Sequence, residues 1–150
     1  MKNNFIKTRV LEILESSYLL SLGTVDDGGV WVSEVIYIHD DDLNIYWMSE
    51  PNCRHSKSIN MDSSVAGTIT TSNHFKEPDF GIQISGTAEK VLENNLGLMI
   101  KYLKKRGVHI PINPIELMKK DFVWYKMTPN KIELIDQESF GYEKRELKLN

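Results

Sequence analysis

A cationic, hydroxyl-rich turn follows a predicted strand at residues 47–58, which read WMSEPNCRHSKS. The strand ends near Ser49, and a helix is expected to begin a few residues later. The first N–H groups of a helix have no acceptor within it, and the helix dipole adds positive potential, so anions bind at such places. Arg54 can donate two parallel hydrogen bonds to a phosphate, and Ser49 and His55 can add donors. The turn from Met48 to Ser58 is therefore a candidate phosphate site.

The same turn has a plainer interpretation. A helix that begins at the surface often carries cations that only face water, and for Arg54 and Lys57 the local pattern by itself favours this interpretation. Cys53 also has two interpretations. A helix amino terminus would lower the pKa of its thiol and make it reactive. No catalytic partner accompanies it in the sequence, however, so a small side chain packed inward is favoured.

The histidines give no indication of a metal site. They occur singly, and no two have the spacing of metal ligands on one helix or strand: His39, His55, His74 and His109. A metal is therefore not expected.

Aromatic and basic side chains outside the turn have two possible uses. Trp31, Trp47 and Trp124 fall on predicted strands, where core packing is the default, although a flat aromatic cofactor also needs such a wall. Lys144 and Arg145 lie near the end of the chain. The sequence alone favours a solvated strand edge there over contact with a bound anion or ring.

Length and composition exclude several classes of protein. Residues 1–150 are expected to form a single domain that folds without disulfides or a structural metal. The formal net charge is −3, and acidic runs at 26–27 and 40–42 argue against nucleic acid as a partner. The amino terminus lacks the pattern of a secretory signal, and no apolar run approaches membrane-spanning length. A single cysteine cannot form an internal disulfide, so a cytoplasmic protein is expected.

Hydrophobic periodicity predicts short helices between groups of strands. Asn3 or Asn4 is expected to cap the first helix and Asn52 the second, and Gly107 is expected to stop the third. The helices are predicted at 5–14, 53–61 and 96–103, with a further helical turn at 115–119. Strands are predicted at 18–25, 30–38, 43–48, 65–71, 80–92, 122–127, 132–135 and 145–149.

Two smaller features complete this outline. Gly86 is expected to form a bulge or bend in the fifth strand, and 137–141 is expected to be a loop. Early hairpins, with helices only between strand groups, favour an antiparallel barrel with flanking helices over alternating βαβ units.

The order of elements and the residues together resemble the pyridoxamine 5′-phosphate oxidase-like, FMN-binding split-barrel family over nearly the whole chain. The family's opening helix and hairpin are similar to residues 11–38, and its phosphate turn resembles LNIYWMSEPNCRHSKSI. The stretches GIQISGTAEKV and VWYKMTPNKIELID are similar to later family strands, and an uncharacterised bacterial subgroup is the closest in pattern. The resemblance implies a mainly β fold, namely an FMN-binding split β-barrel, antiparallel and Greek-key-like, with short flanking helices.

Carried over position by position, the resemblance implies that Arg54 and His55 bind the FMN phosphate. Ser49 takes the place of a hydroxyl ligand, with Met48 beside it, and Gln83 stands near a glutamine that contacts flavin. Histidine replaces the usual lysine at position 55, so phosphate affinity is expected to depend on pH. The family lays the backbone of its second strand along the flavin ring, and the matching residues are Ser33, Glu34, Val35 and Ile36.

The resemblance also implies a partner subunit. Family members are homodimers with two cofactor sites at the interface, so a homodimer is expected. The positions that reach the cofactor from the second subunit match Trp124, Lys144 and Arg145.

The implied activity is that of an FMN-dependent oxidoreductase that exchanges hydride or electrons with a small-molecule substrate or electron donor. The residues that bind the oxidase's substrate phosphate are not clearly reproduced in GYEKRELKLN, so the sequence favours a general flavin oxidoreductase. The alternative is a non-catalytic module of the same fold that stores or senses flavin or haem.

Overall fold

A computed structural model describes residues 1–93, 95–113 and 122–150 of the chain. The described elements, in chain order, are α1 (Lys2–Ser16), β1 (Leu19–Asp26), β2 (Gly29–His39), β3 (Ile45–Ser49), α2 (Arg54–Met61), β4 (Ser64–Thr70), β5 (Phe80–Lys90), α3 (Leu96–Lys105), β6 (Val123–Asp136), α4 (Gln137–Phe140) and β7 (Arg145–Leu147). Within this described part, no helix is long and apolar enough to cross a membrane.

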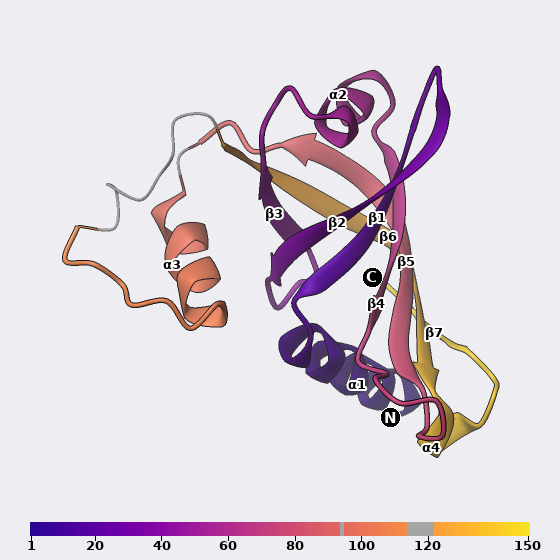
Figure 1. Ribbon diagram of the computed structural model, residues 1–150. Coiled ribbons are helices and arrows are strands. Elements are labelled where there is room, and N and C mark those ends of the chain that lie inside the picture. The colour runs from indigo at the N-terminus through magenta and orange to yellow at the C-terminus, as the bar shows by residue number, and fades with distance from the viewer. Residues whose placement is uncertain (94, 114–121) are drawn as a thin grey trace.

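Six strands close into an antiparallel barrel (Figure 1). Neighbours follow the order β2, β1, β4, β5, β6 and β3, and pairing of β3 with β2 closes the ring. β3 pairs with β6 along Val123–Met127, and β7 pairs with β6 further on, along Ile132–Leu134. The barrel is therefore closed along the first half of β6, and the expected mainly β split barrel is confirmed.

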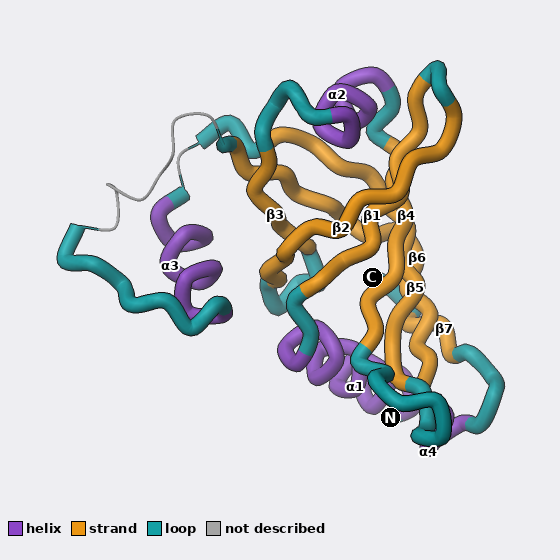
Figure 2. Tube along the Cα trace, in the orientation of Figure 1, coloured by secondary structure: helices purple, strands orange, loops and turns teal. Residues whose placement is uncertain are grey.

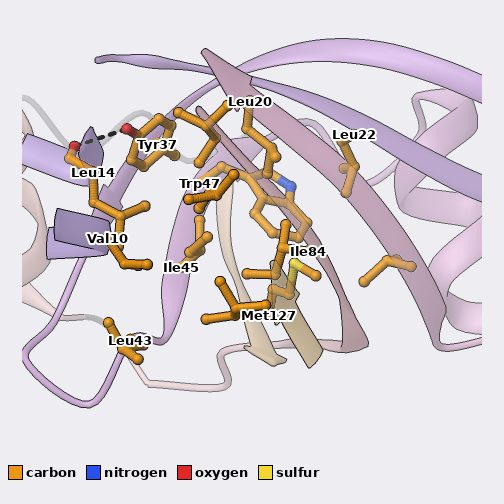
Figure 3. Packing of buried hydrophobic residues seen from close by; sticks show 14 of the residues in the cluster. Val10, Leu14, Leu20, Leu22, Tyr37, Leu43, Ile45, Trp47, Ile84 and Met127 are labelled. Carbon is orange, nitrogen blue, oxygen red and sulfur yellow. Dashed lines mark hydrogen bonds between the residues drawn. The ribbon is translucent and has the colours of Figure 1, made fainter. Parts of the chain in front are cut away.

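Side chains fill the inside of the barrel (Figure 3). The rings of Trp47 and Tyr125 stack with their centroids 6.1 Å apart, and neither residue is exposed. The spacing of Val10 and Leu14 turns one face of α1 onto this core, and the Tyr37 hydroxyl donates a hydrogen bond of 2.7 Å to the Leu14 carbonyl. A ligand site must therefore lie outside the packed interior.

The helices flank the barrel at separate places (Figure 2). α1 lies at one end, and α2 lies at the other end beside the turn of the β1–β2 hairpin. α3 stands at the side and packs on β2 through buried Met99 and Leu103. α1 thus packs on the core at one end, and α2 is the helix beside the hairpin turn at the other.

The structure corrects two predicted helix caps. The residue before α1 is Met1, without a side-chain cap, because Asn3 lies inside the helix and exchanges hydrogen bonds with the backbone of Lys148 instead. Cys53, not Asn52, precedes α2. The predicted helical turn at 115–119 lies outside the described residues.

Two predicted features of the second half are also wrong. The two strands expected on either side of Pro129 form one strand, β6, because Pro129 falls where the register shifts opposite Gly86 and no ladder N–H is needed there. The expected bulge at Gly86 is confirmed by the same shift. Residues 137–140, predicted as loop, form α4, which the Asp136 carboxylate caps by accepting a bond from the Ser139 N–H.

Candidate functional site

The amino end of α2 is open to an external acceptor. β3 ends at Ser49, and after a short turn Cys53 precedes the helix with its thiol donating to the Glu50 carbonyl at 3.0 Å. In the described part of the chain no side chain caps α2. The first N–H groups of a helix cannot bond within it, so this end of α2 can receive an anion.

Arg54, the first residue of α2, is tied to the β1–β2 hairpin. Its Nε donates to Asp26 Oδ2 at 3.0 Å and its Nη2 donates to Asp26 Oδ1 at 3.1 Å. The guanidinium carbon lies 4.4 Å from the centre of the Trp31 ring, within cation–π range. A guanidinium carries five N–H donors, so three remain for another acceptor.

Asp26 is a saturated acceptor. Besides Arg54, it accepts hydrogen bonds from Ser58 Oγ at 2.7 Å and from the Gly28 N–H at 2.8 Å. The hydrogen bonds from Arg54, followed by that from Ser58, hold the pKa of this carboxyl far below its usual range. Asp26 is therefore an anion throughout the physiological range and fixes the direction of Arg54.

His55 faces away from Arg54. Its Nε2 is hydrogen bonded to the buried Ser49 hydroxyl at 2.9 Å and lies 3.3 Å from the Cys53 thiol. Burial lowers the pKa of His55 below its ordinary value, so the ring is neutral at pH 7. The two residues expected to share a phosphate thus differ: Arg54 carries charge toward the hairpin, and His55 is a neutral group under the helix start.

A hollow of about 440 Å³ opens beside Arg54, between α2 and the hairpin turn, and is called the α2 hollow below. Its wall combines two cations, two carboxylates, neutral polar groups and one apolar side chain: Asp26, Asp27, Gly28, Asn52, Arg54, Lys57, Ser58 and Met61. Two carboxylates face two cations, so the wall itself is close to neutral. Such a wall can bind a phosphate only with the help of the helix N–H groups.

The four predicted residues of β2 alternate between two faces. Val35 belongs to the core, and Ser33 on the same face is half-buried. Glu34 is exposed on the other face and accepts a hydrogen bond from Ser21, while half-buried Ile36 follows it. Of these four residues Val35 alone is buried, and the outer pair is the one on the face away from the core.

The other predicted residues lie apart from the α2 hollow within one chain. Met48 pairs with Trp124 across β3 and β6, and the buried Trp124 ring contacts Tyr102 of α3 with centroids 5.8 Å apart. Gln83 lies on β5, which β1 and β4 separate from β2. Arg145 and Lys144 lie at β7, near the end of the barrel occupied by α1 (Figure 1).

Sequence reasoning missed two residues of the site. The sequence marks Asp26 only as part of an acidic run and favours core packing for Trp31, yet Trp31 is 44% exposed and both residues hold Arg54. Their closeness to each other follows from the hairpin register, which pairs Thr24 with Trp31. Arg54 lies 28 residues after Asp26, so no local sequence pattern predicts the contact between these two residues.

Comparison with known proteins gives a family match over most of the chain. The family model described as pyridoxamine 5′-phosphate oxidase matches residues 6–136. The UPF0306 protein PM1958 of Pasteurella multocida (strain Pm70) is 20% identical over 127 residues, which cover 84% of this chain and 85% of that protein.

Two solved structures share the fold. The conserved hypothetical protein Rv2991 from Mycobacterium tuberculosis superposes with a TM-score of 0.77 at 15% identity, covering 91% of this chain and 88% of that one. HutZ, the haem storage protein from Vibrio cholerae, superposes with a TM-score of 0.69 at 14% identity, covering 86% and 93%. At these identities the likeness concerns the fold.

Proposed function

The chain belongs to the pyridoxamine 5′-phosphate oxidase family, and from this premise we propose that it binds FMN and acts as an FMN-dependent oxidoreductase. The observation that carries the proposal is the uncapped amino end of α2 beside a pre-oriented arginine. Helix N–H groups and three unused guanidinium donors form a donor set suited to a phosphate monoester. The FMN phosphate would take this place.

The residues of the α2 hollow fit a phosphate in chemistry as well as in position. Lys57 and Arg54 supply positive charge, and Asn52 and Ser58 supply neutral polar groups. Asp26 does not repel the ligand as a free carboxylate would, because it is paired with Arg54 and accepts from Ser58. His55 lies outside this wall, where its ring bonds to Ser49, and being neutral it adds no second charge at pH 7.

The outer face of β2 supports a place for the flat ring. Val30 and Val32 are 74% and 60% exposed on this face, next to the hairpin that holds Arg54. Exposed apolar side chains in a row suit an aromatic ring system or a protein partner. We propose that the isoalloxazine ring and a second copy of the chain together cover this face of β2.

A homodimer would also explain the remaining predicted residues. Lys144 and Arg145 lie near the α1 end of the barrel, so within one chain they are remote from α2 (Figure 1). They can serve the cofactor only from a partner subunit. We propose a homodimer with a cofactor site at each side of the interface, in the cytoplasm as the single cysteine favours.

Bound FMN supplies hydride and electron transfer at its ring. The residues of this chain supply position and electrostatics. Arg54 and the α2 N–H groups hold the phosphate, Asp26 and Trp31 keep Arg54 in place, and the apolar β2 side chains exclude water from one side of the ring. The substrate or electron donor would approach the opposite side.

A second candidate function is a non-catalytic module that binds flavin or haem. The shared fold with the haem storage protein HutZ supports it. The two candidates differ in turnover, because a storage module holds its ligand without passing electrons on repeatedly.

The visible spectrum of gently purified protein tests the proposal. Bound oxidised flavin makes the protein yellow and is released as an identifiable mononucleotide on denaturation, whereas haem shows a Soret band. A colourless protein that does not bind added FMN contradicts the proposal. Repeated oxidation of a nicotinamide donor or a reduced partner by the loaded protein supports the oxidoreductase, and binding without turnover over a broad donor panel supports the module.

A further inference from the structure

A second hollow, of about 320 Å³, lies at the junction of α1, β2 and α3 and is called the α3 hollow. It is separate from the α2 hollow, since α1 and α2 lie at opposite ends of the barrel (Figure 1). The wall is formed by the carboxyl end of α1, one residue of β2 and the end of α3: Glu15, Ser16, Ser17, Tyr18, Ile36, Lys105 and Arg106. The proposed cofactor site uses Ile36 alone of these residues.

Lys105 is the unusual group of this hollow. Its amine donates to the Leu14 carbonyl at 3.0 Å and lies 3.9 Å from the centre of the Tyr37 ring. One side of the amine nitrogen thus faces the Leu14 carbonyl of α1, and a second side faces the Tyr37 ring of β2. Because Lys105 also lines the hollow, a ligand can reach the amine nitrogen from its third side.

The surroundings of Lys105 favour an uncharged amine. Burial is the main cause and lowers the pKa of Lys105 to about 8, against the opposing carboxylate of Glu15. At pH 8 about half of such an amine is neutral, compared with about 0.3% of an ordinary exposed lysine. The charged and titratable groups around it come from all three elements: Glu15 of α1, Tyr37 and His39 of β2, and Lys101 and Arg106 of α3.

We propose that Lys105 is a carbonyl-reactive amine and that the α3 hollow binds a small aldehyde bearing a carboxylate or phosphate. The aldehyde follows from a neutral, immobilised primary amine at the edge of a cavity. The anionic group follows from Arg106, the cation that lines the hollow beside Lys105. Lys101, whose amine donates to the His39 carbonyl, adds positive potential at Lys105 from outside the wall.

The reaction is a reversible condensation. The Lys105 nitrogen attacks the carbonyl carbon, a C–N bond forms, and a proton moves from nitrogen to the former carbonyl oxygen. The C–O bond then breaks with a second proton delivered to the leaving hydroxyl, so water leaves and a protonated imine remains. Glu15 lines the same hollow and is placed to relay these protons. No oxidant or reductant is consumed.

Reductive trapping of the full-length protein tests the proposal. Glyoxylate supplies the aldehyde, cyanoborohydride reduces the imine, and peptide mass spectrometry after a protease that does not cut at lysine gives the rate at each position. We expect Lys105 to react at least about tenfold faster than exposed Lys104 at pH 7.5, because about a quarter of an amine with a pKa of about 8 is neutral at that pH and the hollow holds the aldehyde beside it. The Lys105 rate should level off above pH 8.

The alternative role of Lys105 is only to cap α1, and it makes the opposite prediction. A buried amine engaged with a carbonyl and a ring would be the slowest lysine of α3, so labelling of Lys104 at an equal or higher rate overturns the proposal.

Propionaldehyde, which has no charge, should show a smaller preference for Lys105 than glyoxylate. Equal preference would overturn the anionic part of the proposal.

In Lys105→Arg, which keeps a donor to Leu14, the fast-reacting position should disappear while the circular dichroism spectrum is unchanged. A fast position that persists elsewhere on α3 overturns the assignment.

Discussion

Asp26 and Arg54 join the β1–β2 hairpin to the first turn of α2 through two parallel hydrogen bonds, of 3.0 and 3.1 Å. The Trp31 ring covers the same guanidinium. Arg54 is thereby oriented before any ligand arrives, so less conformational entropy is lost when an anion binds. Its remaining N–H groups are the ones left to the ligand.

This arrangement makes an unusual prediction for Asp26→Asn. Removal of a negative charge near an anion site ordinarily strengthens anion binding, but here it frees Arg54, so we expect the Kd for FMN to rise about tenfold. Asp27→Asn is the matched control. It removes the same charge from the same hollow without touching Arg54, and should leave the Kd unchanged or lower it. Fluorescence titration with FMN measures both, and tighter binding by Asp26→Asn would contradict the positioning role.

Arg54 and Lys57 line the same hollow but are expected to differ in importance. Arg54→Ala should weaken FMN binding by about ten- to a hundredfold, because it removes charge-assisted hydrogen bonds of fixed direction. Lys57→Ala removes an equal charge, carried on a flexible side chain, and should raise the Kd for FMN less than about threefold. Equal losses in titrations at the same ionic strength would mean that the hollow is merely basic.

His55 makes the stability of the fold depend on pH. Burial lowers its pKa in the folded protein below the ordinary 6.5, so the unfolded chain takes up the proton first as the pH falls. The contribution of neutral His55 is complete above about pH 6.5 and is lost as the pH falls through the folded pKa. We expect the free energy of unfolding, measured in urea, to fall between pH 7 and pH 5 in the wild type and to fall less in His55→Gln. His39, whose pKa burial also lowers, should account for part of the remaining slope.

The register shift of β5 and β6 predicts a severe effect at Gly86. A Cβ there would lie 2.1 Å from the Thr128 carbonyl oxygen and 2.9 Å from Pro129 Cα, and both are backbone atoms that cannot rotate away. Gly86→Ala should lower the free energy of unfolding by about 2 kcal/mol or more. Gly97→Ala is the control, because its Cβ meets only the Asn95 side chain, at 3.2 Å, and alanine favours the helix. Similar urea midpoints for the two variants would disprove the close approach.

The strands and helices of this fold were largely predictable because their signals are local. Alternation of apolar residues marks β1 to β5, and Gly86 predicted the bulge. The continuity of β6 was not predictable, since a proline normally ends a strand unless a shift in the partner strand accommodates it, as it does opposite Gly86. In the site, composition marked the turn at residues 47–58 as a candidate phosphate site, although the local pattern by itself favoured a solvated helix start.

The direction of each side chain in that turn could not be predicted. Arg54 and His55 are adjacent in sequence and were expected to act together, but one meets a carboxylate 28 residues earlier and the other turns under the helix to Ser49. Tertiary contacts decide such directions, and a sequence pattern contains none of them.

β6 pairs with β5 along one edge and with both β3 and β7 along the other. Its backbone amides are therefore shared among three partners, and none of these strands can detach while β6 stays intact without exposing a row of unpaired groups. Amide hydrogen exchange at Tyr125 and Met127, where β6 pairs with β5 and β3 at once, should consequently proceed only through cooperative unfolding of the whole barrel, whereas the hairpin turn at Gly28 can open locally. The region that holds the proposed ligand and the region that holds the fold together are thus separate in their dynamics.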